Sequence, residues 1–119
     1  MPSLTITTNV KVPDQKAFVL AFSKLAAETL RKPETYISVS YNYDEFLTFA
    51  GSVEPAFLMT IVSLDNINPE LNDQYSKVFF DHFNEKLGVE GNRGYITYID
   101  PGRAYLGHKG TTFATIFGK

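Results

Sequence analysis

The sequence predicts an α+β domain of two layers, in which a four-stranded sheet carries two helices on one face. Three observations lead to this fold class. The order strand–helix–strand occurs twice, over about residues 2–43 and 56–99, and the two stretches have similar lengths. A crossover through a helix makes the strands that it joins parallel, so each stretch predicts one β-α-β unit. The 119 residues, of which 44% are hydrophobic, suffice for a single domain with its own core.

The first unit begins with an alternating stretch and continues into an amphipathic one. Residues 2–9 alternate between apolar and polar side chains, which predicts a strand. Residues 12–14 are typical of a helix start, and apolar residues recur at helical spacing over residues 15–30. Lys32-Pro33 ends this helix, because Pro disfavours helical geometry in the residue before it. Residues 36–41 mix aromatic and β-branched residues with Ser and predict the second strand.

The second unit follows a connection over residues 44–55, in which residues 47–49 could form a short strand. Residues 56–64 form a nearly continuous apolar run, which predicts a strand buried on both faces. A second helix is introduced by residues 66–69, and Gly88 is typical of its C-terminal cap.

The last strand of the sheet is predicted over residues 94–99, and a short extra strand over residues 111–117. With both helices on one face, the other face of the sheet needs cover from a second sheet or another subunit. The segments 47–49, 105–106 and 111–117 are predicted edge strands, available for pairing between chains. The layout therefore predicts an oligomer.

The composition argues against several classes of function. The formal net charge is −2 and Lys and Arg are scattered, which argues against nucleic-acid and anionic-membrane partners. No apolar run could span a bilayer and no signal peptide is recognisable, so we expect a cytoplasmic protein. Cys is absent, which removes disulfides, thiolate zinc sites and thiol redox chemistry. His82 and His108 have no partner set for a metal, and phosphate-binding loops are missing.

Pro2 is the first candidate for chemistry, because it directly follows Met1. Aminopeptidases usually remove Met before a small residue, which here would leave a secondary amine at the start of a strand. An α-amino group has a pKa of ~7.7–8.0, and burial or a nearby cation lowers that pKa. A neutral amine at physiological pH can act as a general base. Two alternatives are a Pro2 that merely starts the strand and a retained Met1, which would turn the amine into an amide.

Short motifs along nearly the whole chain occur in a specific order and spacing. They are Met1-Pro2, Thr8-Asn9-Val10, Lys32-Pro33, Tyr36-Ile37, Phe49-Ala50-Gly51-Ser52, Glu54-Pro55, Tyr75-Ser76-Lys77, Tyr95-Ile96, Gly107 and Thr112-Phe113-Ala114. In these motifs the chain resembles the migration inhibitory factor and D-dopachrome tautomerase family of the tautomerase superfamily. The resemblance implies two β-α-β units per subunit and a homotrimer with three active sites between neighbouring subunits.

The same resemblance implies roles for individual residues. Pro2 would be the catalytic base, which moves a proton between the α-carbon and the oxygen of an α-keto acid such as phenylpyruvate. Lys32 would hold the substrate carboxylate and lower the pKa of the Pro2 amine by like-charge repulsion. The backbone N–H of Leu64 would face the substrate, and Tyr95 would come from the adjacent subunit. The apolar walls for an aromatic ring would be Tyr36, Leu106 and Phe113. This chemistry needs a base, a cation and a dry pocket, so we expect no cofactor.

Some positions depart from the family pattern. Thr97 stands where members often have Asn, and its hydroxyl can still donate a hydrogen bond over a shorter reach. His108 replaces a Trp of the vertebrate proteins and changes the polarity of the pocket mouth. Residues 56–59 lack the Cys-x-x-Cys pair of vertebrate members, so the thiol oxidoreductase activity attributed to that pair is not expected.

Two functions from different classes follow from these observations. The first is an enzyme, a phenylpyruvate-type keto–enol tautomerase that uses Pro2. The second is a non-catalytic, cytokine-like signalling or binding trimer, with a receptor as partner if the protein leaves the cell, as relatives can without a signal peptide. A third branch, decarboxylases and dehalogenases, uses additional Arg residues, and no Arg here matches a motif of that branch. Without the resemblance, Lys32 is also explained as a cation at a helix C-terminus.

Overall fold

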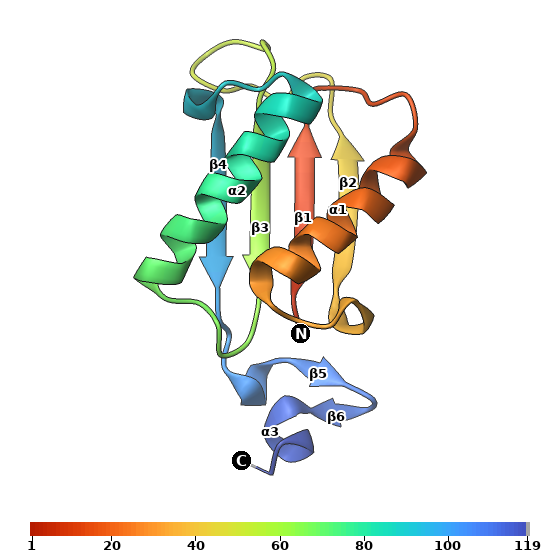
Figure 1. Ribbon diagram of the computed structural model, residues 1–119, viewed down its shortest axis with the longest axis vertical. Coiled ribbons are helices and arrows are strands. Elements are labelled where there is room, and N and C mark those ends of the chain that lie inside the picture. Colours follow the sequence, from red (N-terminus) through yellow and green to blue (C-terminus); the bar gives the residue numbers. More distant parts are fainter. Residues whose placement is uncertain (119) are drawn as a thin grey trace.

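The computed structural model describes residues 1–118, which form two β-α-β units side by side (Figure 1). The first unit contains β1 (Ser3–Thr8), α1 (Gln15–Leu30) and β2 (Ser38–Tyr43). The second contains β3 (Phe57–Val62), α2 (Pro69–Leu87) and β4 (Gly94–Ile99). The strands are parallel within each unit, β1 and β3 pair antiparallel, and the order is β2-β1-β3-β4. Both helices cross one face of this sheet, which confirms the predicted fold class.

Local signals set the bounds of α1. The Asp14 side chain accepts a hydrogen bond from the Ala17 N–H at 3.0 Å and caps the first turn, with Pro13 just outside the helix. At the other end Arg31 adopts the left-handed conformation, with φ 56°. The Lys32 N–H bonds to the carbonyl of Ala27 at 3.1 Å. The predicted helix 15–30 is therefore confirmed at both ends.

The same kind of signals bound α2. The Asn68 side chain accepts from the Leu71 N–H at 2.9 Å, and Pro69 occupies the first helical position, where a missing N–H has no cost. Gly88 ends the helix at φ 67°, and its N–H bonds to the carbonyl of Asn84 at 3.1 Å. Because a residue with a Cβ disfavours this φ, Gly88 is the residue suited to this cap.

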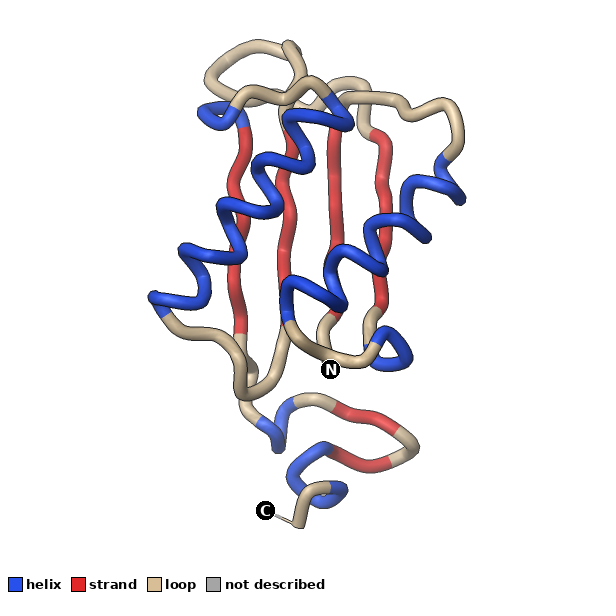
Figure 2. The backbone as a smooth tube through the Cα atoms, in the orientation of Figure 1, coloured by secondary structure: helices blue, strands red, loops and turns tan. Residues whose placement is uncertain are grey.

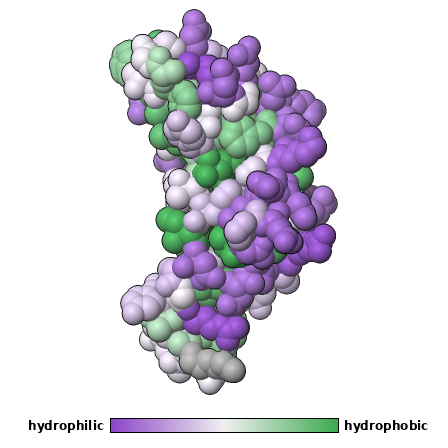
Figure 3. Space-filling model, turned by 90° about the vertical axis from the view of Figure 1, so that its left-hand side faces the viewer, coloured by the Kyte–Doolittle hydropathy of each residue, from purple (hydrophilic) through white to green (hydrophobic). Residues whose placement is uncertain are grey.

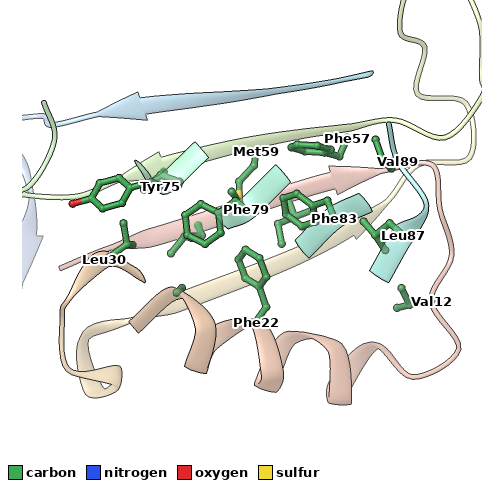
Figure 4. Close-up of a cluster of buried hydrophobic side chains, with 14 residues drawn as sticks. Val12, Phe22, Leu30, Phe57, Met59, Tyr75, Phe79, Phe83, Leu87 and Val89 are labelled. Atoms are coloured by element: carbon green, nitrogen blue, oxygen red, sulfur yellow. The ribbon is translucent and has the colours of Figure 1, made fainter. Parts of the chain in front are cut away.

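Aromatic rings form the centre of the core between the helices and the sheet (Figure 4). Phe22 of α1 stacks on Phe83 of α2, with ring centroids 5.4 Å apart and planes 15° apart. Phe83 also contacts Phe57 of β3, at 4.3 Å between centroids. All three side chains are fully buried, and each such ring stabilises the fold by about 1.5–3 kcal/mol through burial.

Asn9 holds the loop between β2 and β3. Its Nδ2 donates to the carbonyls of Leu47, Val53 and Glu54 at 3.1, 3.0 and 2.8 Å. Its Oδ1 accepts from the Ala56 N–H at 2.9 Å. One side chain thus replaces strand pairing for this loop, and the short strand predicted over residues 47–49 is wrong. The backbone of this loop makes an isolated β-bridge between Phe49 and Ser52 instead.

The sheet face away from the helices is open in the single subunit. β3 alternates between buried and more exposed residues, and Leu58 is 39% exposed. The prediction that this strand is buried on both faces is therefore wrong for one chain, because an apolar run does not tell which face is covered. Figure 3 shows hydrophobic residues at the surface along one side of the molecule, whereas the opposite side is mainly hydrophilic.

The chain leaves the sheet after β4 and forms a small separate segment below it (Figure 2). A 3-10 turn at Arg103–Tyr105 is followed by β5 (Gly107–His108), β6 (Thr111–Thr112) and the short helix α3 (Phe113–Ile116). The edge strand predicted at 105–106 is thus wrong, and the strand predicted over 111–117 is confirmed only for its first two residues. Only two residues of the second range are extended, and the rest turns into α3, because the chain folds back on itself at this point.

Candidate functional site

Pro2 lies at the start of β1, between the ends of the neighbouring strands. Ser3 pairs with Ser38 at the beginning of β2 and with Val62 at the end of β3. The Pro2 carbonyl accepts a hydrogen bond from the Ser38 N–H at 3.1 Å. The Pro2 side chain is fully buried. The sheet therefore fixes the start of the chain in a buried position, at the end of the sheet from which the C-terminal segment departs.

A cavity of about 650 Å³ opens over Pro2. Three segments that are distant in sequence line it: the chain start, the turn before β2, and the hairpin of β5 and β6. Figure 1 shows the N-terminus facing that hairpin. The lining residues are Met1, Pro2, Ser3, Thr35, Tyr36, Ile37, Ser38, Leu106, Gly107, His108, Lys109 and Phe113. The volume lies in the range of pockets that bind small molecules.

The outer wall of the cavity is built by the C-terminal segment. The Phe113 N–H donates to the Leu106 carbonyl at 3.0 Å, which closes the hairpin next to Pro2. The His108 ring stacks on the Phe113 ring, with centroids 5.3 Å apart and planes 7° apart. Phe113 is buried, whereas His108 is exposed at the mouth. The wall is thus apolar inside and polar outside.

The electrostatics at the chain start favour a neutral amine. Burial lowers the pKa of the Met1 α-amino group below its usual range. The positive charge of Lys32 lowers this pKa further, whereas the charge of Asp65 acts in the opposite direction. If Met1 is removed, the α-amino nitrogen becomes that of Pro2, one residue deeper in the same surroundings. The chain start therefore has the two features that turn an ammonium group into a base.

The chain has clear relatives. The sequence profile of the macrophage migration inhibitory factor (MIF) family matches residues 1–114. The chain belongs to this family. It is 40% identical to the macrophage migration inhibitory factor homolog of Trichinella spiralis over 114 residues, which cover 95% of this chain and 100% of the relative. It is 32% identical to the macrophage migration inhibitory factor of Xenopus tropicalis over 117 residues, 96% of this chain and 100% of the relative.

Solved structures of MIF proteins share the fold. The structure of the Trichinella spiralis protein matches with a TM-score of 0.86 at 38% identity, over 93% of this chain and 99% of the other. A homologue from Prochlorococcus marinus also gives a TM-score of 0.86, at 28% identity and over 93% of this chain and 98% of the other. The fold is that of the tautomerase superfamily, which confirms the predicted resemblance.

Five of the predicted site residues come together in this MIF-family chain. They line the one cavity over the chain start and are Pro2, Tyr36, Leu106, His108 and Phe113. Lys32 does not line the cavity, but it lies close enough for its charge to act on the terminal amine. Leu64 follows the end of β3 with a buried side chain, outside the cavity lining.

Tyr95 and Thr97 of β4 lie elsewhere in the subunit. The register pairs Tyr95 with Leu58, and Leu58 with Thr7, so Tyr95 is near the end of the sheet opposite Pro2. Its side chain is 67% exposed and contacts the Phe49 ring at 4.9 Å between centroids. Thr97 is exposed as well. One chain does not bring either residue to its own cavity, so their predicted role requires a neighbouring subunit.

The cavity has polar lining residues that the sequence did not single out. Ser3 and Ser38 pair across β1 and β2, and both line the cavity near Pro2 together with Thr35. The exposed residue Lys109 lines the cavity as well. The register between β1 and β2 could have indicated the two serines, but no local signal marks Lys109.

Two further findings bear on the site. Within residues 1–118, no group of three or more His, Asp or Glu side chains could hold a metal ion. None of the helices in the same range is long and apolar enough to cross a membrane.

The described site consists of an N-terminal nitrogen, hydroxyl and cationic groups, and an apolar wall. Such a set can bind a small organic anion and move a proton on it.

Proposed function

We propose that the protein is a keto–enol tautomerase of small aromatic α-keto acids such as phenylpyruvate, with the Pro2 amine as general base after removal of Met1. The observation that carries the proposal is the α-amino group at the chain start, which lies beside a cavity with one apolar wall and whose pKa, with Met1 present, is lowered by burial and by Lys32. A base with a pKa near the operating pH is the most effective one for proton transfer. Membership of the MIF family supports this proposal.

The proposed mechanism is a proton shuttle of two steps without a cofactor. The neutral Pro2 nitrogen takes a proton from the carbon next to the keto group and leaves an enolate, and the protonated nitrogen then gives a proton to the keto oxygen to form the enol. The Lys32 ammonium would attract the substrate carboxylate, and its charge, which lowers the pKa of the Met1 α-amino group, would act in the same direction on the Pro2 nitrogen once Met1 is removed. Leu106 and Phe113 provide the apolar wall for the substrate ring. Exclusion of water would strengthen the attraction between Lys32 and the substrate carboxylate and the repulsion between Lys32 and a protonated Pro2 nitrogen.

A homotrimer is part of the proposal. The open sheet face presents Leu58, Tyr95 and Ile99 with 39, 67 and 41% exposure, which is costly for a single subunit in water. In a trimer, Tyr95 and Thr97 of one subunit would reach the cavity of its neighbour, and the backbone N–H of Leu64 would face the substrate. Sedimentation or light scattering should then give three times the mass of one chain.

The proposal is tested by phenylpyruvate tautomerisation with protein whose Met1 removal is established by intact mass. We expect turnover well above the buffer rate. Pro2→Gly should lose most of the activity while the trimer persists, and Lys32→Ala should mainly raise KM, because it removes a carboxylate partner. A variant that retains one residue before Pro2 should be inactive. Unchanged turnover in both substituted proteins would rule out the mechanism.

The second candidate is a non-catalytic signalling or binding trimer on the same fold. Thr97 favours it, since family members often have Asn at this position and a hydroxyl reaches less far. No turnover by an intact trimer that lacks Met1 would favour this candidate. Surface loops should then matter for binding to a receptor, and Pro2 should not.

A further inference from the structure

Two lysines lie near the start of the chain, and one of them lines the cavity over Pro2. Lys32 acts on the terminal amine from the side of α1. Lys109 lines the cavity from the loop between β5 and β6. No acidic side chain is among the residues that line the cavity within positions 1–118. None of the ion pairs in the same range involves Lys109. The site thus has a second cation that a monoanionic substrate leaves without a partner.

Lys109 occupies a backbone position that favours other residues. β5 and β6 pair Gly107 with Thr112 and His108 with Thr111, so Lys109 and Gly110 form a two-residue loop. Both have positive φ, 54° and 76°. Loops of this kind favour Asn-Gly, because a side chain such as Lys is strained in the left-handed region. This tight loop fixes the backbone of Lys109 beside the cavity that the residue lines.

Lys109 follows directly on the residues that build the apolar wall of the cavity. The neighbouring His108 ring is held parallel to Phe113, and Leu106 is bonded to Phe113 through the backbone. A substrate ring against Leu106 and Phe113 would lie with one end towards Pro2 and the other towards the hairpin tip. The hydroxyl groups of Ser3, Thr35 and Ser38 line the side of the turn before β2 and provide no charge.

We propose that the preferred substrates carry a second anionic group, remote from the keto acid, which pairs with Lys109. This inference rests on the proposed function, in which Lys32 pairs with the first carboxylate. The reaction is unchanged, since one proton moves from carbon to oxygen and the remote group takes no part in it. The remote group acts through binding only. Attraction to Lys109 is partly screened by water and salt, so its effect is moderate and falls with ionic strength.

The test compares kcat/KM for phenylpyruvate and for phenylpyruvate with a para-carboxylate on its ring. We expect the parent protein to prefer the carboxylated substrate roughly 3- to 10-fold at low salt. Lys109→Asn should abolish this preference, and Lys109→Arg should retain it. Because Asn suits the left-handed position, Lys109→Asn should melt at the same temperature as the parent or higher, which separates loss of selectivity from misfolding. Lys11→Asn is the matched control, since it removes an exposed cation outside the cavity.

The possible failures are distinguishable. If the parent turns over phenylpyruvate but shows no preference, or keeps its preference in Lys109→Asn, the role of Lys109 is wrong and the tautomerase stands. If protein without Met1 turns over neither substrate, the proposed function itself is wrong, and the inference fails with it.

Discussion

The rings of His108 and Phe113 lie parallel, with centroids 5.3 Å apart and planes 7° apart. This pair joins the exposed mouth of the cavity to its buried wall, since His108 is exposed and Phe113 is 4% exposed. The stacked geometry is one of the favourable arrangements of aromatic rings. His108 therefore supports the shape of the wall besides changing the polarity of the mouth.

His108→Ala should loosen this wall. Loss of an aromatic pair costs about 0.5–1.5 kcal/mol, and we expect KM for phenylpyruvate to rise severalfold with a smaller change in kcat. His108→Phe keeps a ring against Phe113 and should stay close to the parent protein. Steady-state kinetics of both variants, compared with the parent protein, test this expectation for KM. Equal KM values in all three proteins would show that the stacking is irrelevant to substrate binding.

Gly94→Ala should destabilise the sheet. A Cβ at Gly94 would lie 2.2 Å from Cε1 of the Phe57 ring, which is fully buried. Overpacking of this kind costs about 1–3 kcal/mol in the free energy of unfolding, measured by urea titration. Gly91→Ala is the matched control, since a Cβ there meets nothing within 4 Å, and it should change stability by less than about 0.5 kcal/mol. Similar stability of the two variants would contradict this packing.

Asn9→Ala should release the loop between β2 and β3. The substitution removes three donated hydrogen bonds and the acceptor for the Ala56 N–H, at about 1–3 kcal/mol of stability. Limited proteolysis should then cut within residues 44–55 before the rest of the chain. Asn92→Ala, at an exposed position, should leave both stability and the cleavage pattern unchanged. Uniform cleavage of the Asn9 variant would argue against a specific role of this side chain.

His82 should make the fold sensitive to acid. Burial lowers the pKa of its imidazole below the usual value, the charge of Lys86 lowers this pKa further, and Glu85 opposes the shift. Its Nε2 is buried without a hydrogen-bond partner among the described residues. The unfolded chain then binds the proton more readily than the folded one, at a pKa of about 6.5. The contribution of neutral His82 to the free energy of unfolding is fully present above that pH, and it is lost as the pH falls through the folded-state pKa of this side chain.

His82→Phe tests this dependence. The free energy of unfolding is measured between pH 7.5 and 5 for the parent and the variant. The decrease below about pH 6.5 should be smaller in the variant, because its ring cannot take up a proton. His108→Phe removes the other histidine and should keep the acid sensitivity of the parent. Parallel pH profiles of the parent and His82→Phe would contradict the assignment.

Much of the fold could be predicted because the signals are local. Asp14, Asn68 and Gly88 act on backbone groups within one turn of themselves, so the ends of both helices are readable along the chain. The two β-α-β units follow from periodicity and the handedness of crossovers. The second strand was expected over residues 36–41 and lies at Ser38–Tyr43, because a 3-10 turn at Glu34–Tyr36 delays its start.

The sequence by itself determined the two units, their helices, the family resemblance and the candidate base Pro2. Tertiary structure alone decided that β1 and β3 pair antiparallel, which places Pro2 at the end of the sheet next to the C-terminal segment and Tyr95 near the far end. It also decided that Lys109 faces the same cavity as Pro2. The physical reason is that strand register and hairpin placement depend on partners distant in sequence, and no local spacing encodes them.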